Sequence, residues 1–108
     1  MSDVLHENLF IWDENKHKAN IKKHKVDFFE AVTVFDDPNA FSEYDKEHSQ
    51  DEDRFVITGI SENMRLLIVC HCFRGNDDLI RIISARKATK PEANKYGGAR
   101  WKLSIIQG

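Results

Sequence analysis

Cationic and imidazole side chains are the groups of this sequence that could do chemistry. Histidine exchanges protons near neutral pH, while arginine binds phosphate and stabilises negative charge that develops on it. Cleavage of RNA without a metal needs a base for the 2′-hydroxyl proton, cations around the phosphate and an acid for the leaving oxygen. The candidates for such chemistry are His24, Arg54, His71, Arg81 and Arg86.

Most of these candidates also have a structural interpretation. Arg54 follows an acidic loop and could form a surface ion pair there. His24 ends a predicted helix, whose dipole would stabilise a protonated imidazole. His71 lies in an apolar strand, where a lone histidine is commonly a hydrogen-bonded core residue. His48, in a polar loop, is the weakest candidate.

Two of the arginines belong to one predicted strand, "DLIRIISAR" at residues 78–86. A strand alternates its side chains between two faces, which places Arg86 with Ser84 and Arg81 on the opposite face with Ile83. An arginine inside an apolar strand is costly unless it is paired or serves a functional surface. We therefore expect function at this strand.

Charge is segregated along the chain. Residues 16–25 hold five lysines, two histidines and no acid, whereas residues 36–53 hold eight acids and a single lysine. The formal net charge of −2 argues against a general nucleic-acid-binding protein, but the basic block could meet an anion locally. Alternatively, Lys22 and Lys23 could form an ordinary solvated helix face.

Capping signals predict two helices near the start of the chain. Asp13 is a good N-cap for a helix over residues 14–24, which should end at Lys25 in a left-handed conformation. Asp27 then caps a second helix, with Glu30 as its capping-box partner. Glu30 could also be a base, although its capping position favours a structural role.

After the acidic loop the pattern changes to period two. Residues 54–60, 64–72 and 78–86 read as strands joined by short turns, which makes an antiparallel meander. A further short strand is expected around residues 40–44. Together with the helices, this order predicts an α+β fold with the helices packed on the sheet.

The C-terminal region is predicted to hold a third helix. Thr89 and Glu92 form a capping box, and Gly97 with Gly98 ends the helix. Beyond it, residues 99–108 could form another strand or a tail docked on a partner.

Several classes of protein are excluded at the level of motifs. The sequence has no P-loop, dinucleotide-binding turn, serine elbow or HExxH pair. Cys70 and Cys72 point the same way on a strand, with His71 opposite, so we expect neither a disulfide nor a metal site. No apolar run is long enough to span a bilayer, and no cofactor is expected. We predict a single domain over residues 1–108 of a cytoplasmic protein.

Three segments together resemble the BrnT family of small bacterial ribonuclease toxins. They are "FIWDENKHKANIKKHKVDFFEAVTVFDDP", "DRFVITGISENMRLLIVCH" and "IRIISARKATKPE", and the resemblance covers residues 10–96. The positions that match the family pattern are Trp12, Asp13, Lys16, Asn20, Lys23, His24, Glu30, Ala31, Arg54, His71, Arg81, Ser84, Arg86 and Ala88.

The resemblance implies a RelE-like fold and an endoribonuclease that arrests growth by cutting RNA. It also implies a BrnA-like antitoxin partner, with operator DNA contacted only through the toxin–antitoxin complex. On this basis His24 or His71 would transfer protons, while Arg54, Arg81 and Arg86 would bind phosphate and stabilise the transition state. The first helix would form one wall of an RNA groove, and the lysines assigned to RNA are Lys16, Lys22, Lys23 and Lys87.

Two departures from the family pattern keep other hypotheses open. The usual glycine after His24 is Lys25, and the usual acid before Glu30 is Phe29. A non-catalytic module that binds an antitoxin and acts in operon repression is therefore the alternative. A general nucleic-acid-binding domain is a third hypothesis, which the net negative charge disfavours.

Overall fold

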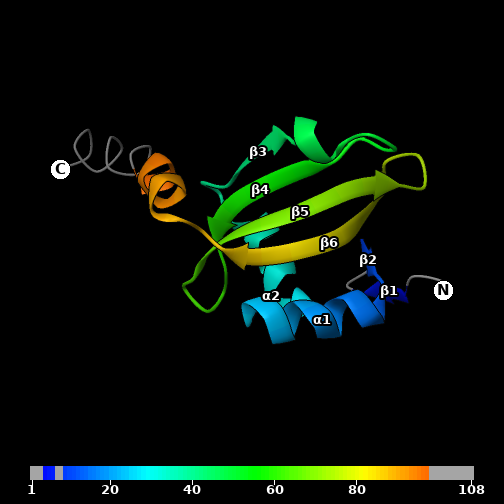
Figure 1. The fold of residues 1–108 in the computed structure, drawn as a ribbon, viewed down its shortest axis with the longest axis horizontal. Helices are drawn as coiled ribbons and strands as arrows, with labels where there is room; N and C mark the ends of the chain where they lie inside the picture. Colours follow the sequence, from blue (N-terminus) through cyan, green and yellow to red (C-terminus); the bar gives the residue numbers. More distant parts are fainter. Residues whose placement is uncertain (1–3, 7–8, 98–108) are drawn as a thin grey trace.

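A computed structural model of the protein describes residues 4–6 and 9–97, and its described strands form one six-stranded sheet in the order β1-β2-β6-β5-β4-β3 (Figure 1). The predicted tail at residues 99–108 lies outside the described residues. The strands are β1 Val4–His6, β2 Phe10–Trp12, β3 Phe41–Tyr44, β4 Phe55–Ile60, β5 Leu66–Arg74 and β6 Leu79–Lys87; the helices are α1 Glu14–His24, α2 Phe28–Thr33, the 3₁₀ turns η1 Val34–Asp36 and η2 Lys46–His48, and a helix over residues 90–97.

The α+β class and the antiparallel meander β4-β5-β6 are confirmed. The expected short strand is present as β3, and it pairs antiparallel with β4. Two strands were not predicted: β2 pairs in parallel with β6, and β1 pairs antiparallel with β2, so the sheet is mixed. Both are three residues long, which is too short for an alternating pattern to show.

The predicted limits of α1 are confirmed. The Asp13 side chain accepts hydrogen bonds from the backbone N–H groups of Asn15 and Lys16 at 2.8 and 3.2 Å. Lys25 ends the helix with φ 60° and ψ 32°, the left-handed conformation that was expected. Asp27 caps α2 through the N–H of Phe29. The helices are thus defined by local capping.

Glu30 does not complete the predicted capping box. Its carboxylate instead accepts hydrogen bonds from Ser61 Oγ at 2.6 Å and from Arg65 Nε at 2.9 Å, and it pairs with the Nη2 group of Arg65. These partners belong to the turn between β4 and β5, more than thirty positions away in the chain. Arg65 also donates to the carbonyl of Lys25, so the ion pair ties both helices to the sheet.

The core lies between one face of the sheet and α1 and α2. α2 lies behind the sheet in Figure 1, and α1 runs along the edge beside β6. The helix at residues 90–97 lies at the end of the sheet, where it contacts side chains from β3 and β6. No helix among the described residues is long and apolar enough to span a membrane. The core residues are Phe10, Trp12, Val26, Phe28, Ala31, Val32, Val34, Ile57, Leu67, Val69, Ile82 and Ala85.

Asn20 fixes α1 against the sheet. β2 pairs only with the start of β6, and further along β6 the buried Asn20 amide takes the place of a neighbouring strand. Its Nδ2 donates to the carbonyl of Ala85 at 2.8 Å, and its Oδ1 accepts from the N–H of the same residue at 3.0 Å. The half-polar inner face of α1 is explained by this contact and by the buried His17.

Candidate active site

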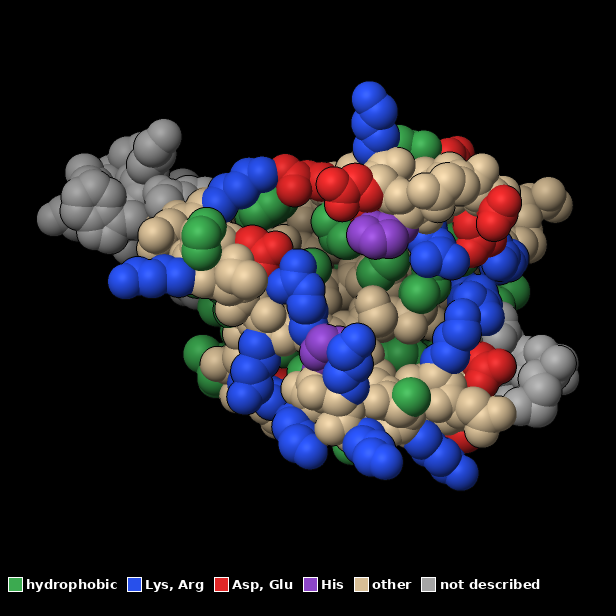
Figure 2. Space-filling model, viewed as in Figure 1, with side chains coloured by type: hydrophobic (Ala, Val, Ile, Leu, Met, Phe, Trp, Pro, Cys, Tyr) green, Lys and Arg blue, Asp and Glu red, His purple; other side chains and the backbone are tan. Residues whose placement is uncertain are grey.

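The face of the sheet opposite α2 carries a polar hollow of about 190 Å³, lined in part by Arg54, Ser84 and Arg86. A second hollow of about 450 Å³ adjoins it and reaches the helix at residues 90–97. The two share Asp45, His48 and Arg86 among their lining residues. They therefore form one groove across the strands, and Figure 2 shows this face toward the reader.

Arg54 lines this hollow and also carries a buried nitrogen without a hydrogen bond to the described residues. Its Nε atom is buried and has no hydrogen-bond partner among the described residues, although it lies 3.7 Å from Glu52 Oε1. The predicted ion pair with the acidic loop therefore exists, but it does not satisfy this N–H. A buried donor without an acceptor costs free energy.

Arg86 is held by the C-terminal helix. Its two terminal nitrogens donate to both carboxylate oxygens of Glu92, at 2.8 and 2.9 Å. These hydrogen bonds lower the pKa of Glu92 to about 2, helped by the N–H of Thr89. The predicted capping box between Thr89 and Glu92 is present, so one carboxylate both caps the helix and orients the arginine.

A β-bulge brings Arg81 to the same face as Arg86. Ser84 pairs with Cys70, but Ile82 pairs with His71. Ile83 of β6, which lies between them, is therefore left without a partner in the register. Beyond this bulge Arg81 lies opposite Cys72, on the face of the hollow. The expectation that Arg81 faces the opposite way is wrong, because strict alternation of side chains does not continue through a bulge.

His71 lies on the other face of the sheet, within the core. Its side chain is almost fully buried, contacts the rings of Phe35 and Phe73, and its Nδ1 lies 3.1 Å from the carbonyl of Val69. Burial lowers the pKa of His71, which favours the neutral imidazole. The structure therefore separates His71 from the arginines and gives it the packing role that was the alternative interpretation.

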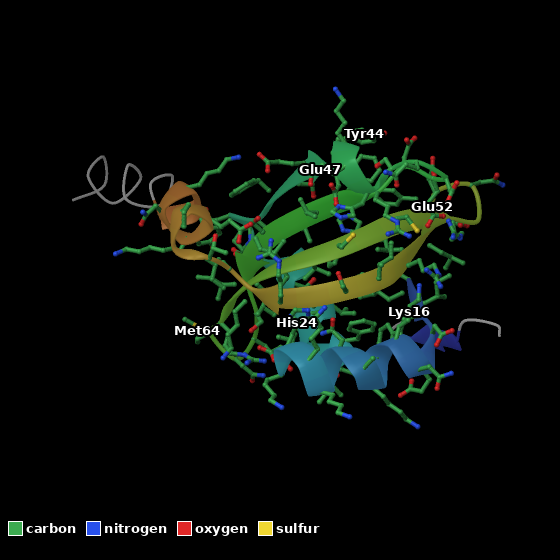
Figure 3. All side chains as sticks on the ribbon, in the orientation of Figure 1. Lys16, His24, Tyr44, Glu47, Glu52 and Met64 are labelled. Atoms are coloured by element: carbon green, nitrogen blue, oxygen red, sulfur yellow. The ribbon has the colours of Figure 1, made fainter. Side chains whose placement is uncertain are left out.

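Two of the predicted basic residues of the first helix, Lys16 and His24, lie on the side of the helix toward the sheet (Figure 3). His24 is half-buried, but it is not among the residues that line the hollow. Lys and Arg side chains gather over α1 in Figure 2, below the hollow. The four lysines assigned to RNA, Lys16, Lys22, Lys23 and Lys87, are all exposed.

His48, the weakest histidine at the level of the sequence, is the one that lines the hollow. Its Nδ1 lies 2.8 Å from Asp45 Oδ2, and its side chain is 62% exposed. The spacing Asp-x-x-His inside a 3₁₀ turn was the available signal, because residues three apart lie on one side of such a turn. Sequence reasoning ranked His48 last because its segment resembles an ordinary acidic loop.

No group of three or more potential metal ligands occurs within residues 4–6 and 9–97. Both cysteines are free thiols, and burial raises the pKa of each. The chemistry available on this face is therefore that of guanidinium, imidazole, carboxylate and hydroxyl groups.

Comparisons with known proteins give one family. The family described as "Ribonuclease toxin, BrnT, of type II toxin-antitoxin system" matches residues 12–92. The crystal structure of the Brucella abortus ribonuclease toxin BrnT is similar to this chain, with a TM-score of 0.58 and 25% identity; the match covers 76% of this chain and 99% of that one. No curated protein matches the chain. The matched residues include Arg54, Arg86 and Glu92.

Proposed function

The chain belongs to the BrnT family of ribonuclease toxins of type II toxin–antitoxin systems, and on that premise we propose that it is an endoribonuclease that cleaves RNA without a metal. Cleavage would inhibit growth and translation, and a BrnA-like antitoxin would neutralise it. Operator DNA would be contacted only through the complex with that antitoxin. The site on the open face of the sheet is the proposed place of reaction.

The presence of Arg54 and Arg86 around one hollow is the observation that carries this proposal. A phosphate in that hollow would lie beside two guanidinium groups. Each guanidinium donates in a fixed fork that matches the oxygens of a phosphate. An RNA phosphodiester is an anion of this kind.

Arg86 would share its fork between Glu92 and the substrate. Glu92 occupies the two terminal nitrogens, while Nε of Arg86 has no hydrogen bond to any described residue. The carboxylate fixes the plane of the guanidinium before RNA arrives, which favours stabilisation of charge that develops later on the phosphate. We assign Arg81, on the same face beyond the bulge, to the next phosphate along the strand.

The wall formed by α1 would hold the RNA backbone and supply a proton. Its exposed lysines offer cations without a fixed geometry, as sequence-independent backbone contacts require. His24 lies on the side of this wall that faces β6 (Figure 3). We assign His24 to protonation of the leaving 5′-oxygen, because the wall lies across the hollow from Arg54.

The reaction would be a transesterification. The 2′-oxygen attacks phosphorus, the bond from phosphorus to the 5′-oxygen breaks, and the products end in a 2′,3′-cyclic phosphate and a 5′-hydroxyl. The 2′-hydroxyl proton passes to a base, and the leaving oxygen receives a proton from an acid. The step transfers protons and exchanges one bond to phosphorus for another, so it requires no electron transfer and no cofactor.

The test is incubation of the purified protein with total RNA in EDTA, beside Arg54→Ala, Arg86→Ala and Lys90→Ala. Lys90 is exposed at the start of the last helix and does not line either hollow, so it is the control. We expect cyclic-phosphate ends from the wild type and Lys90→Ala, and a loss of at least about 10²-fold from each arginine variant. Circular dichroism checks that the variants are folded.

Equal cleavage by all four proteins would contradict the assignment of the arginines. Cleavage that stops in EDTA and returns with a divalent ion would contradict metal independence. The non-catalytic module predicts no cleavage and no growth arrest when the protein is expressed without a partner. An inducible growth assay with the same variants therefore separates the two functions.

A further inference from the structure

We infer that His48, held by Asp45, is the general base that activates the 2′-hydroxyl; this inference rests on the proposed ribonuclease function. His48 lines both hollows of the groove, and a third hollow beside Arg54. Neither His71, in the core, nor His24, on the opposite wall, lines the hollow that contains Arg54. Among the described residues His48 is thus the histidine that lines this hollow, whereas His24 approaches the groove from α1.

The hydrogen bond to Asp45 sets the tautomer that a base requires. An ionised carboxylate only accepts hydrogen bonds, so Nδ1 of His48 carries the proton that it donates to Asp45 Oδ2, at 2.8 Å. The lone pair of the neutral imidazole is then on Nε2. Nε2 has no hydrogen bond to any described residue, and the exposed ring leaves it accessible to substrate. A carboxylate–imidazole pair of this geometry is the arrangement that orients a base in several hydrolases.

The backbone locks this pair to the proposed phosphate ligand. The N–H of Asp45 donates to the carbonyl of Arg54 at 2.8 Å. Ser49 Oγ donates to the carbonyl of Asp45 and accepts from the N–H of Arg54 at 2.9 Å. The Asp45 side chain is only 17% exposed, so it is well shielded from solvent. Base and phosphate ligand therefore belong to one hydrogen-bonded turn and would approach the substrate in a fixed relation.

The two histidines of this face lie on opposite sides of the hollow. Figure 3 shows Glu47, the neighbour of His48 in η2, on the β3 side of the sheet and His24 on the α1 side. An in-line displacement needs the base beside the attacking oxygen and the acid beside the leaving oxygen, on opposite sides of phosphorus. In the proposed step Nε2 of His48 takes the 2′-hydroxyl proton as the bond from O2′ to phosphorus forms, while His24 gives a proton to O5′ as its bond breaks.

The pH dependence follows from the groups that face His48. Glu52 and Glu92 are ionised throughout the neutral range, because hydrogen bonds from Arg74 and Arg86 lower the pKa of each carboxyl. Imidazole is the side chain of this set that ordinarily titrates between pH 5 and 8. The other charged and titratable groups that line the three hollows with His48 are Glu43, Tyr44, Asp45, Glu47, Asp51, Glu52, Arg54, Cys70, Arg86, Glu92 and Lys95.

The test compares His48→Ala with Lys46→Ala, an exposed position in the same turn that lines neither hollow. We expect kcat of His48→Ala to fall by about 10² to 10⁴, while affinity for a 2′-deoxy oligonucleotide stays within about twofold. Added imidazole should restore part of the activity of His48→Ala but none of Arg54→Ala. The pH profile of kcat/KM should change in His48→Ala and be kept in Lys46→Ala.

Asp45→Asn gives a second, independent variant. It should lower kcat less than His48→Ala, because the base remains but its tautomer is no longer fixed. Wild-type cleavage by His48→Ala with an unchanged pH profile would overturn the inference and leave the ribonuclease function standing. Absence of cleavage by the wild-type protein, with or without divalent ions, would overturn both.

Discussion

Replacing Arg65 by Met should destabilise the protein strongly, because it leaves the buried carboxylate of Glu30 without its counter-charge. Glu30 is only 6% exposed, and Arg65 supplies its counter-charge through Nε at 2.9 Å and through Nη2. Removing one member of a buried ion pair costs about 3–5 kcal/mol. Arg65 is 30% exposed and Ser61 remains as a donor, so we expect about 3 kcal/mol. For a domain of this size, that corresponds to a fall in Tm of about 10–20 °C.

Urea denaturation of a matched set measures this cost. Glu30→Leu, Arg65→Met and the double variant Glu30→Leu with Arg65→Met form a cycle. The double variant should be more stable than Arg65→Met alone, because it leaves no unpaired buried charge. A cost below about 1 kcal/mol for Arg65→Met, the value typical of exposed ion pairs, would refute the reasoning.

The pH dependence of the same pair has a definite sign. Hydrogen bonds from Arg65 hold the pKa of Glu30 below its ordinary value, against the opposing effect of burial. A carboxyl with a depressed folded-state pKa stabilises the protein above its unfolded pKa, near 4.5, and loses that stabilisation as pH falls further. Wild type should therefore lose stability below about pH 4.5 more steeply than Glu30→Gln. Glu30→Gln should also retain cleavage, because Glu30 is committed to Arg65 and is not available as a base.

Three further predictions concern single contacts. Asn20→Ala should cost about 3 kcal/mol in urea denaturation, because it leaves buried backbone groups of Val26 and Ala85 without partners; a cost under about 1 kcal/mol would contradict this. Lys25→Gly should raise stability by about 0.5–1 kcal/mol, since φ is 60° there, whereas Lys25→Ala should not. Glu92→Gln should lower Tm at pH 7 through a loss of about 1 kcal/mol, and the difference should disappear toward pH 2 as the wild-type carboxyl protonates; a difference that is constant with pH would show that charge is not the cause.

Local signals of the sequence predicted the helices well. Asp13 and Asp27 cap α1 and α2 within three residues of themselves, and Thr89 with Glu92 starts the last helix in the same way. The left-handed Lys25 follows from the need to turn between two capped helices. These features depend on residues that are close together in the chain, so they can be predicted from the sequence alone.

Features that depend on distant partners were not predictable in this way. Pairing of β2 with β6 joins Phe10 to Ile80, and nothing near either residue signals it. The bulge in β6 reverses the face of Arg81, and one inserted residue leaves no mark on an apolar strand. The partner of Glu30 was missed for the same reason, because Arg65 lies on a turn far along the chain.

The two faces of the sheet differ: one packs against the helices, and the other carries the polar groove. Asn20 links the first helix to the edge of this sheet. On one face α1 and α2 bury the apolar residues together with His71. On the other face the acidic turn and the last helix place Arg54, His48 and Arg86 around one groove, and the bulge turns Arg81 to the same face. Asn20 pins α1 to the backbone edge of β6, which places a lysine-rich helix, otherwise an ordinary surface, along the border of that groove. The position of the basic wall therefore depends on a buried amide rather than on the charges themselves.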